Sequence, residues 1–268
     1  MKLWKNTSTL DSLCDSILNT AEPSIADIAL IGGKKIDLST LPNLKGIFKC
    51  GVGTDNVPFE ECEKRGIEVG LPSADTAEII FEETATFTVS MIFRMLYSEV
   101  GSIDSWRKMQ RTIAAKKSVL IVGLGNIGRR VAGKLEGSVN VLHFDHLQVE
   151  NTSLEELMGQ ADVVSMHIPL TKDNRSFFDK EKLSWLKDGA AIVNTARGAI
   201  VDEEALFLEI QSGRLRAAFD VFWEEPYKGK LVQFADDRFF MTPHVASTSR
   251  QFLEGLLKDF KEFAKKVC

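Results

Sequence analysis

Residues 117–145, with the sequence KSVLIVGLGNIGRRVAGKLEGSVNVLHFD, restrict the possible folds of this chain more than any other stretch. The run VLIV at 119–122 is short, apolar and rich in β-branched residues, and a glycine ends it, so it predicts a buried strand. A helix is expected over 129–135 and a second strand over 139–144, which ends at Asp145. Strand, glycine-rich turn, helix, strand and terminal acid in this order are typical of a dinucleotide-binding unit.

The turn itself, GLGNIG, has a physical reason for each of its glycines. Gly123 allows the tight turn, Gly125 lets the backbone approach a pyrophosphate, and Gly128 lets the next helix pack closely on the strand. The first amides of that helix and its dipole point to where two phosphates would bind. A lone G-x-G-x-x-G motif is often only a turn, but the flanking elements favour the dinucleotide interpretation. The expected cofactor-binding residues here are Gly123, Gly125, Asn126, Ile127, Gly128 and Asp145, whose carboxylate can accept hydrogen bonds from the adenosine ribose.

The composition suits a globular enzyme and gives no sign of a nucleic-acid or membrane partner. The 268 residues allow one large or two modest domains, and 44% of them are hydrophobic. A formal net charge of -5 gives no electrostatic attraction to nucleic acid or to an anionic membrane. The N-terminus lacks the apolar core of a secretory signal, and the most apolar window, 87–97, is about half the length of a membrane span. We therefore expect a cytoplasmic protein.

The cysteines give no sign of a metal site or of a disulfide framework. They stand far apart in the chain and form no CxxC pair, and no histidines are interleaved with them. We expect free thiols at Cys14, Cys50, Cys62 and Cys268, and no bound metal.

The first part of the chain predicts a small α/β unit that ends in a long apolar helix. Residues 1–21 predict a helix with no strand before it, and 98–116 predict a polar linker or an exposed arm. The helix at 76–97 is apolar on all sides, as expected for a helix buried between two structural units. We expect one domain to comprise 1–97 with 250–268, and the other to comprise 98–249. Strands are expected at 25–31, 46–50 and 67–69, and a short helix at 59–64.

After Asp145 strands and helices continue to alternate, which is the sequence pattern of a parallel, doubly wound sheet. The fold class is therefore α/β, and the C-terminal segment 251–266 predicts an amphipathic helix. The other strands are expected at 163–168, 190–194, 217–221 and 239–241, and the other helices at 153–158, 180–186 and 203–211.

Three polar residues follow strands of this sheet: Arg197, Glu225 and His244. That edge is where cofactor and substrate meet in such folds. A histidine can exchange a proton with a carbonyl or alcohol oxygen, and a nearby carboxylate such as Glu225 would favour its charged form and fix its tautomer. The planar guanidinium of Arg197 can pair with a substrate carboxylate. Each residue has a plain alternative, a surface salt bridge for Arg197 or Glu225, and His167 has a structural interpretation.

Six motifs together resemble one known family, the D-isomer-specific 2-hydroxyacid dehydrogenases, which include phosphoglycerate, glycerate and hydroxypyruvate-type enzymes. The motifs are LKGIFKCGVGTDNV, IVGLGNIGRRVA, HIPLT, AAIVNTARGAIVDEEAL, AAFDVFWEEP and MTPHVAST, and they cover most of residues 44–250. The resemblance implies two Rossmann-like domains: a doubly wound parallel sheet that binds NAD, and a smaller flavodoxin-like domain that binds the substrate. It also implies NAD-dependent oxidation or reduction of a small 2-hydroxy or 2-keto acid by a homodimer.

The resemblance assigns roles to particular residues as well. It makes Arg197, Glu225 and His244 the catalytic set, and it places Asp220 near the nicotinamide amide. The glycine loop would bind the substrate carboxylate, although by itself it can also be a plain turn. The implied substrate-binding residues are Cys50, Gly51, Val52, Gly53 and Arg197, and the further cofactor-binding residues are Pro169, Thr195, Ala196, Asp220 and His244.

The chain also departs from the family pattern. It is expected to lack the usual first strand and part of the segment 98–116 that often supports the dimer, and the region after Asp145 is trimmed. Lys34 and Lys35 stand near the place where phosphoglycerate enzymes usually carry an arginine, and formate-using relatives usually have glutamine in place of Glu225. The alternatives are a dinucleotide-sensing regulator that resembles known corepressors of this fold, and a degraded enzyme.

Overall fold

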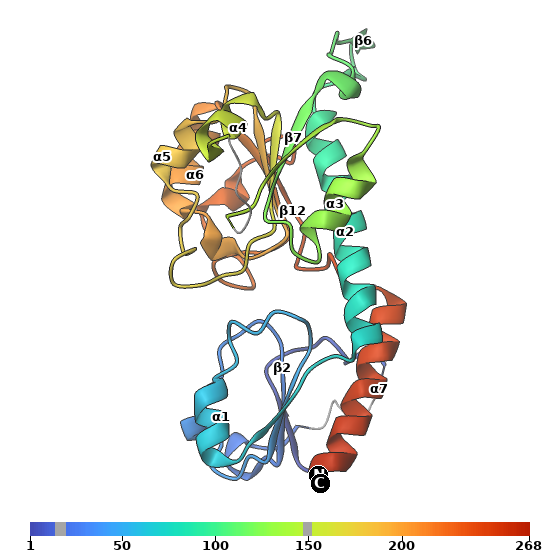
Figure 1. The fold of residues 1–268 in the computed structure, drawn as a ribbon, viewed down its shortest axis with the longest axis vertical. Helices are drawn as coiled ribbons and strands as arrows, with labels where there is room; N and C mark the ends of the chain where they lie inside the picture. Colours follow the sequence, from blue (N-terminus) through green and yellow to red (C-terminus); the bar gives the residue numbers. More distant parts are fainter. Residues whose placement is uncertain (14–19, 147–151) are drawn as a thin grey trace. The chain divides into compact units, whose positions relative to one another are not determined.

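The computed structural model describes residues 1–13, 20–146 and 152–268 (Figure 1). These form two compact units, one of Met1–Ile80 with Ser247–Cys268 and one of Phe81–Ala246. Helix α2, Ala74–Leu96, contains the junction at Ile80 and Phe81. The sequence-based domains divide at 97/98 and 249/250 instead, and where the functional domains end stays a prediction. Each unit is described by itself below.

The larger unit is built on a six-stranded sheet in which every paired strand is parallel. The strand order is β12-β11-β10-β9-β7-β8. The chain runs from β7 outward to β8 and then crosses back to β9 on the other side of β7. Strands β7 and β9 therefore flank a topological switch point, the usual ligand site in such sheets. The doubly wound prediction is confirmed. The strands are β7 (Ser118–Val122), β8 (Asn140–Phe144), β9 (Val163–Met166), β10 (Ala191–Asn194), β11 (Arg216–Phe219) and β12 (Phe239–Met241).

Helices cover both faces of this sheet (Figure 1). On one face lie α4 (Leu154–Gln160), α5 (Lys180–Ser184) and α6 (Glu203–Ser212), and on the other lie α3 (Gly128–Leu135) and the second part of α2. Side chains of β7 alternate between the two cores: Leu120 and Val122 join the first, whereas Val119 and Ile121 join the second. Because a strand buried on both faces has no polar side, it reads in the sequence as a continuous apolar run.

The smaller unit has four parallel strands in the order β1-β2-β3-β4. Within its described residues, 1–13, 20–80 and 247–268, this order equals the flavodoxin-like order 2-1-3-4-5 with the outermost strand, numbered 2, left out. Aromatic rings of α7 pack on the sheet, with Phe48 and Phe260 ring centroids 5.6 Å apart. The elements are β1 (Leu3–Lys5), β2 (Ile28–Ile31), β3 (Gly46–Lys49), β4 (Glu68–Gly70), α1 (Phe59–Arg65), the start of α2, and α7 (Arg250–Val267).

The prediction of a helix over 1–21 with no strand before it was wrong. Residues 3–5 form β1, where Leu3, Trp4 and Lys5 pair in parallel with 28–30, and residues 9–13 form turns. Leu3 is buried against the core of this unit, so tertiary pairing outweighs the helical spacing of the leucines further along. The rest of the predicted helix, 14–19, lies outside the described residues, as do 147–151. The first strand expected to be missing is therefore present.

Of the two alternatives predicted for the segment 98–116, a polar linker or an exposed arm, the structure shows an exposed arm. It contains a short antiparallel pair, β5 (Gly101–Ser102) and β6 (Arg107–Lys108). Ile103 and Trp106 lie between these strands and are 81% and 78% exposed. Among the helices that the structure describes, none is both long enough and apolar enough to cross a membrane.

Candidate active site

The glycine turn that follows β7 is shaped by close backbone packing. Gly123 has a φ of +96°, and a Cβ atom there would lie 2.8 Å from the carbonyl group of His167. A Cβ atom on Gly128 would lie 1.9 Å from the carbonyl oxygen of Gly123, so only glycine lets α3 begin here. Around Gly125, by contrast, a Cβ atom would meet nothing within 4 Å. This glycine leaves open space over an exposed backbone, which fits close approach by a phosphate.

The start of α3 suits an anion. The N-cap residue of this helix is Ile127, whose side chain makes no hydrogen bond to the first amides of the helix. Asp145 directly follows β8 beside the same turn, and its Oδ2 accepts a 2.8 Å hydrogen bond from the amide of Leu124. That bond fixes the carboxylate next to the turn. Its side chain stays 14% exposed.

His167 lies directly after β9 and next to the glycine turn. Its Nε2 is 2.9 Å from the hydroxyl of Ser165, a fully buried residue of β9. Burial lowers the pKa of His167 to about 3, so the ring stays neutral at physiological pH. These contacts agree with the structural interpretation of this histidine.

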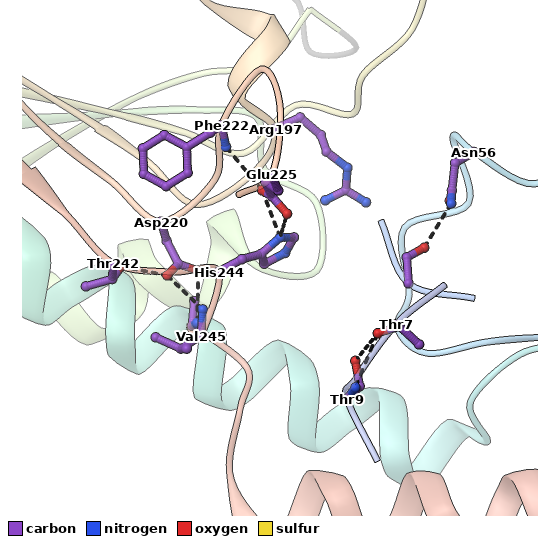
Figure 2. Close-up of polar contacts among 12 residues, drawn as sticks. Thr7, Thr9, Asn56, Arg197, Asp220, Phe222, Glu225, Thr242, His244 and Val245 are labelled. Carbon is purple, nitrogen blue, oxygen red and sulfur yellow. Dashed lines mark hydrogen bonds and ion pairs between the residues drawn. The ribbon is translucent and has the colours of Figure 1, made fainter. Parts of the chain in front are cut away.

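The structure brings His244 and Glu225 together (Figure 2). The Nδ1 atom of His244 lies 2.9 Å from Oε2 and 3.1 Å from Oε1 of Glu225. Burial alone would raise the pKa of Glu225, but the hydrogen bond and charge of His244, the Phe222 amide and the nearby Arg197 lower it below its ordinary value. Glu225 is therefore an ionised acceptor that holds Nδ1, which leaves Nε2 to face a ligand. A cavity of about 520 Å³ borders both residues.

His244 has a strained backbone that Asp220 holds in place. The φ of His244 is +53°, a left-handed conformation that is uncommon for any residue other than glycine. Asp220 accepts hydrogen bonds from the Thr242 hydroxyl at 2.6 Å, the Val245 amide at 2.8 Å and the Ala246 amide at 2.9 Å. Asp220 has no exposed surface, and burial raises its pKa against the effect of these bonds. Its carboxylate therefore organises the loop on both sides of the histidine.

Arg197 follows β10 in a turn that is tied down at several points. Its guanidinium Nη1 donates a 2.7 Å hydrogen bond to the carbonyl of Ala196. The hydroxyl of Thr195 is 2.8 Å from that of Thr88 on α2, and both residues are buried. A Cβ atom on Gly198 would lie 2.2 Å from the backbone carbon of Phe222, so this turn contacts the segment that leads to Glu225. Arg197, Glu225 and His244 all belong to the larger unit (Figure 2).

The predicted substrate loop belongs to the smaller unit. Cys50 follows β3, and its amide donates to Ile31 at 2.8 Å. Gly51 has a φ of +142°, so the turn after β3 needs a glycine there. Burial raises the pKa of Cys50 to about 12, so its thiol stays protonated. The binding role of 50–53 stays a prediction.

Two residues at the site were missed by the sequence analysis, Asn194 and Gly198. Asn194 is fully buried and spans the Arg197 turn, with bonds of 2.9 Å to the amide of Ala196 and the carbonyl of Arg197. The available signal was a polar residue that ends the apolar run AAIV directly before TARG. For Gly198, the signal was a glycine next to a candidate catalytic arginine.

The predicted cofactor-binding residue Pro169 is exposed, and its carbonyl accepts a 3.0 Å hydrogen bond from Asn174.

A doubly wound sheet, a glycine turn at its switch point and a histidine–carboxylate pair at its strand ends define a dinucleotide-dependent oxidoreductase of the α/β class. Residues 33–95 match the catalytic domain of the D-isomer specific 2-hydroxyacid dehydrogenases, and 94–246 match their NAD binding domain. The chain therefore belongs to the D-isomer-specific 2-hydroxyacid dehydrogenase family and binds NAD.

Relatives agree with this assignment. The chain is 34% identical over 242 residues to a hydroxypyruvate reductase from Thermotoga maritima, a match that covers 82% of this chain and 78% of that protein. It is 33% identical over 239 residues to a glyoxylate reductase from Aeropyrum pernix, covering 80% and 70%. Among solved structures, the D-lactate dehydrogenase from Aquifex aeolicus, complexed with NAD and lactic acid, is similar with a TM-score of 0.78 and 27% identity, covering 91% and 83%. The family and its cofactor were thus predicted correctly.

Proposed function

We propose that this chain reduces a small 2-keto acid with NADH, or oxidises the corresponding D-2-hydroxy acid, and that His244 exchanges the proton. The observation that carries the proposal is the contact of 2.9 Å between His244 Nδ1 and Glu225 Oε2 at the strand ends of the NAD-binding sheet. A histidine whose Nδ1 is held by a carboxylate can present a proton on Nε2 to a ligand. The acidic partner and the left-handed loop fix that ring.

In the reducing direction, Nε2 of protonated His244 gives its proton to the carbonyl oxygen of the keto acid, and the oxygen becomes the hydroxyl group. NADH, when bound, would supply the hydride for the carbonyl carbon. Glu225 stays ionised throughout and stabilises the positive charge that His244 carries before the transfer. In the oxidising direction, neutral His244 takes the hydroxyl proton, so the same residue acts as base.

Arg197 would hold the substrate carboxylate. Its guanidinium presents two parallel N–H groups that match a carboxylate, and the same charge can polarise the adjacent carbonyl. It is near enough to Glu225 to lower the pKa of that residue, so a carboxylate bound to it would lie close to the acid–base pair. The amides of 51–53 and the backbone at Cys50 are proposed to bind a substrate carboxylate.

The residues around the glycine turn fit NAD. The open space at Gly125 and the start of α3 would take the pyrophosphate, and Asp145 would accept hydrogen bonds from the ribose hydroxyls. The fixed carboxylate would repel the 2′-phosphate of NADP. Pro169, Thr195, Ala196, Asp220 and His244 complete the proposed cofactor set, although Asp220 and Thr195 already use their side chains for contacts within the unit.

Small acids are the proposed substrates because relatives bear the names hydroxypyruvate reductase, glyoxylate reductase and D-lactate dehydrogenase. We also propose a homodimer that uses the arm 98–116, whose Ile103 and Trp106 are apolar and exposed. A cytoplasmic location remains part of the proposal. The enzyme names of these relatives favour a dehydrogenase over a dinucleotide-sensing regulator.

A panel of 2-keto acids assayed with NADH tests the proposal. Glyoxylate, hydroxypyruvate, pyruvate and 3-phosphohydroxypyruvate would be compared by the loss of NADH absorbance. Turnover of at least one acid, lost in His244→Gln, is the expected result. A protein that binds NADH but turns over none of the acids would instead be a regulator or a degraded enzyme.

A further inference from the structure

We infer that Asn194 is a positioning residue for Arg197, an inference that rests on the proposed role of Arg197 in binding the substrate carboxylate. Asn194 is the last residue of β10 and has no exposed surface. Because Asn194 is fully buried, we do not propose that its side chain contacts a ligand. Its effect on the reaction would act through the three residues that follow it.

The side-chain amide of Asn194 bonds to both ends of a short turn. Its Oδ1 accepts a 2.9 Å hydrogen bond from the amide of Ala196, and its Nδ2 donates a 2.9 Å bond to the carbonyl of Arg197. A primary amide offers a donor and an acceptor on one short, planar group. An ionised aspartate would keep the acceptor and lose the donor. Alanine would lose both and leave two part-buried backbone groups without these partners.

The turn is anchored to the sheet on either side of this amide. The carbonyl of Asn194 accepts a 3.0 Å hydrogen bond from the amide of Asp220, at the end of the neighbouring strand β11. Thr195 contacts Thr88 through their hydroxyl groups. These contacts fix where the turn begins. The Asn194 side chain reaches forward to the carbonyl of Arg197, which also accepts a 3.2 Å hydrogen bond from the amide of Ile200. The backbone of Arg197 is extended, with φ -151° and ψ 136°. Because its carbonyl group and its side chain are bonded to the same Cα atom, a shift of the carbonyl would move the side chain as well.

The plain alternative is that Asn194 only stabilises the strand end. In that case its loss would lower the melting temperature and leave the kinetics of the folded protein unchanged. A positioning role predicts a different result, because displacement of a substrate-holding group by about 1 Å can cost on the order of a hundredfold in rate. The loss should appear in the KM for the keto acid and in kcat, and not in the affinity for NADH.

The test compares Asn194→Ala and Asn194→Asp with the matched control Val193→Ala. Val193 is the preceding residue of β10 and is fully buried, but it packs in the core formed with α2 and α3. All three variants should lower the melting temperature. We expect kcat/KM for the keto acid to fall roughly tenfold to a hundredfold in both Asn194 variants and less than about threefold in Val193→Ala. NADH affinity, measured by fluorescence, should stay within about twofold in all three.

Two further measurements do not depend on turnover. Binding of oxamate, a keto-acid analogue with a carboxylate, to the protein–NADH complex should weaken in the Asn194 variants. A crystal structure of Asn194→Ala should show Arg197 displaced, while Thr195 stays hydrogen-bonded to Thr88. An undisplaced turn, or a displaced turn with unchanged kcat/KM in an active protein, would overturn the inference. If the parent protein turns over no acid but the turn is displaced and oxamate binding weakens, the proposed activity fails while the positioning of Arg197 stands.

Discussion

The backbone amide of Asp220 donates a hydrogen bond of 3.0 Å to the carbonyl oxygen of Asn194, which joins the ends of two neighbouring strands. From these two buried residues, side chains extend to the segments that carry Arg197 and His244. The candidate catalytic groups are thus held by polar side chains at one edge of a rigid sheet. Supporting contacts of this kind fix a site more tightly than loops alone can.

The first prediction concerns the acid–base residue. In His244→Gln, kcat should fall on the order of a hundredfold or more, because no positioned proton donor remains. NADH should still bind, since the glycine turn is untouched. The matched control is His143→Gln, which replaces an exposed histidine of β8 and should leave turnover unchanged. Steady-state kinetics with NADH decide the matter, and near-normal turnover in His244→Gln would show that the proton comes from another group.

The second prediction concerns Arg197 and separates an enzyme from a regulator. Arg197→Lys keeps the charge and loses the two parallel N–H donors, so KM for the keto acid should rise and kcat should fall. The affinity for NADH should hardly change, as measured by fluorescence titration. A large loss of NADH binding in this variant would refute the role assigned to Arg197. A regulator would show no turnover in the parent protein and no response to the substitution.

The third prediction concerns the close contact between Gly198 and Phe222. A Cβ atom on Gly198 would lie 2.2 Å from the backbone carbon of Phe222 and 2.5 Å from the backbone nitrogen of Trp223, which cannot rotate away as a side chain could. Gly198→Ala should therefore push apart the segments that carry Arg197 and Glu225, destabilise the protein by about 1–3 kcal/mol and reduce kcat/KM.

Gly133→Ala is the control for Gly198→Ala. Gly133 lies within α3, and a Cβ atom there meets nothing within 4 Å. That variant should gain up to about 1 kcal/mol in stability, since alanine favours helix more than glycine does, and its kinetics should not change. Urea denaturation and steady-state assays check both variants. An active and stable Gly198→Ala would mean that the two segments adjust independently.

Much of this arrangement was predictable from the sequence, and the exceptions have physical causes. The strands of the larger unit were recognisable because burial on both faces leaves apolar runs such as 119–122. The order strand, turn and helix around Gly123 and Gly128 could be inferred because backbone packing permits only glycine there. The strand at 3–5 was missed because it is short and its pairing with 28–30 is not local. Likewise, no periodic pattern marks Asn194 as the residue that spans the Arg197 turn.

The roles of polar residues were also harder to predict from the sequence than their positions in the fold. The family pattern places Asp220 near the nicotinamide amide, which stays a prediction. In the structure its carboxylate is buried and accepts three hydrogen bonds from the His244 loop. A sequence shows that an acid precedes a valine. It does not show which donors a later loop will bring, because those contacts join positions more than 20 residues apart.

The fourth prediction concerns the choice between NADH and NADPH. The Asp145 carboxylate is held beside the glycine turn by the amide of Leu124. Two like charges about 4 Å apart repel by about 1 kcal/mol even in water, so kcat/KM should favour NADH by about fivefold or more. Asp145→Asn keeps an acceptor for the Leu124 amide and removes the charge, and this preference should shrink. Equal kcat/KM for the two cofactors in the parent protein would contradict the role given to Asp145.

The last prediction concerns pH and stability through His167. Burial lowers its folded pKa to about 3, whereas an unfolded histidine titrates near its ordinary value of 6.5. Between these values the unfolded chain binds one more proton than the folded chain, so stability rises with pH. The stability contributed by neutral His167 is complete above pH 6.5 and is lost as the pH falls toward 3.

Urea denaturation at pH 7, 6 and 5 measures this dependence. The free energy of unfolding should fall by up to about 2 kcal/mol from pH 7 to pH 5 through this residue. His167→Gln has no ring to protonate and should remove most of that slope. His143→Gln, which replaces an exposed histidine, should retain the slope of the parent protein. An NMR titration that gives His167 a pKa near 6.5 in the folded protein would contradict this prediction. So would a pH slope of the unfolding free energy that is unchanged in His167→Gln.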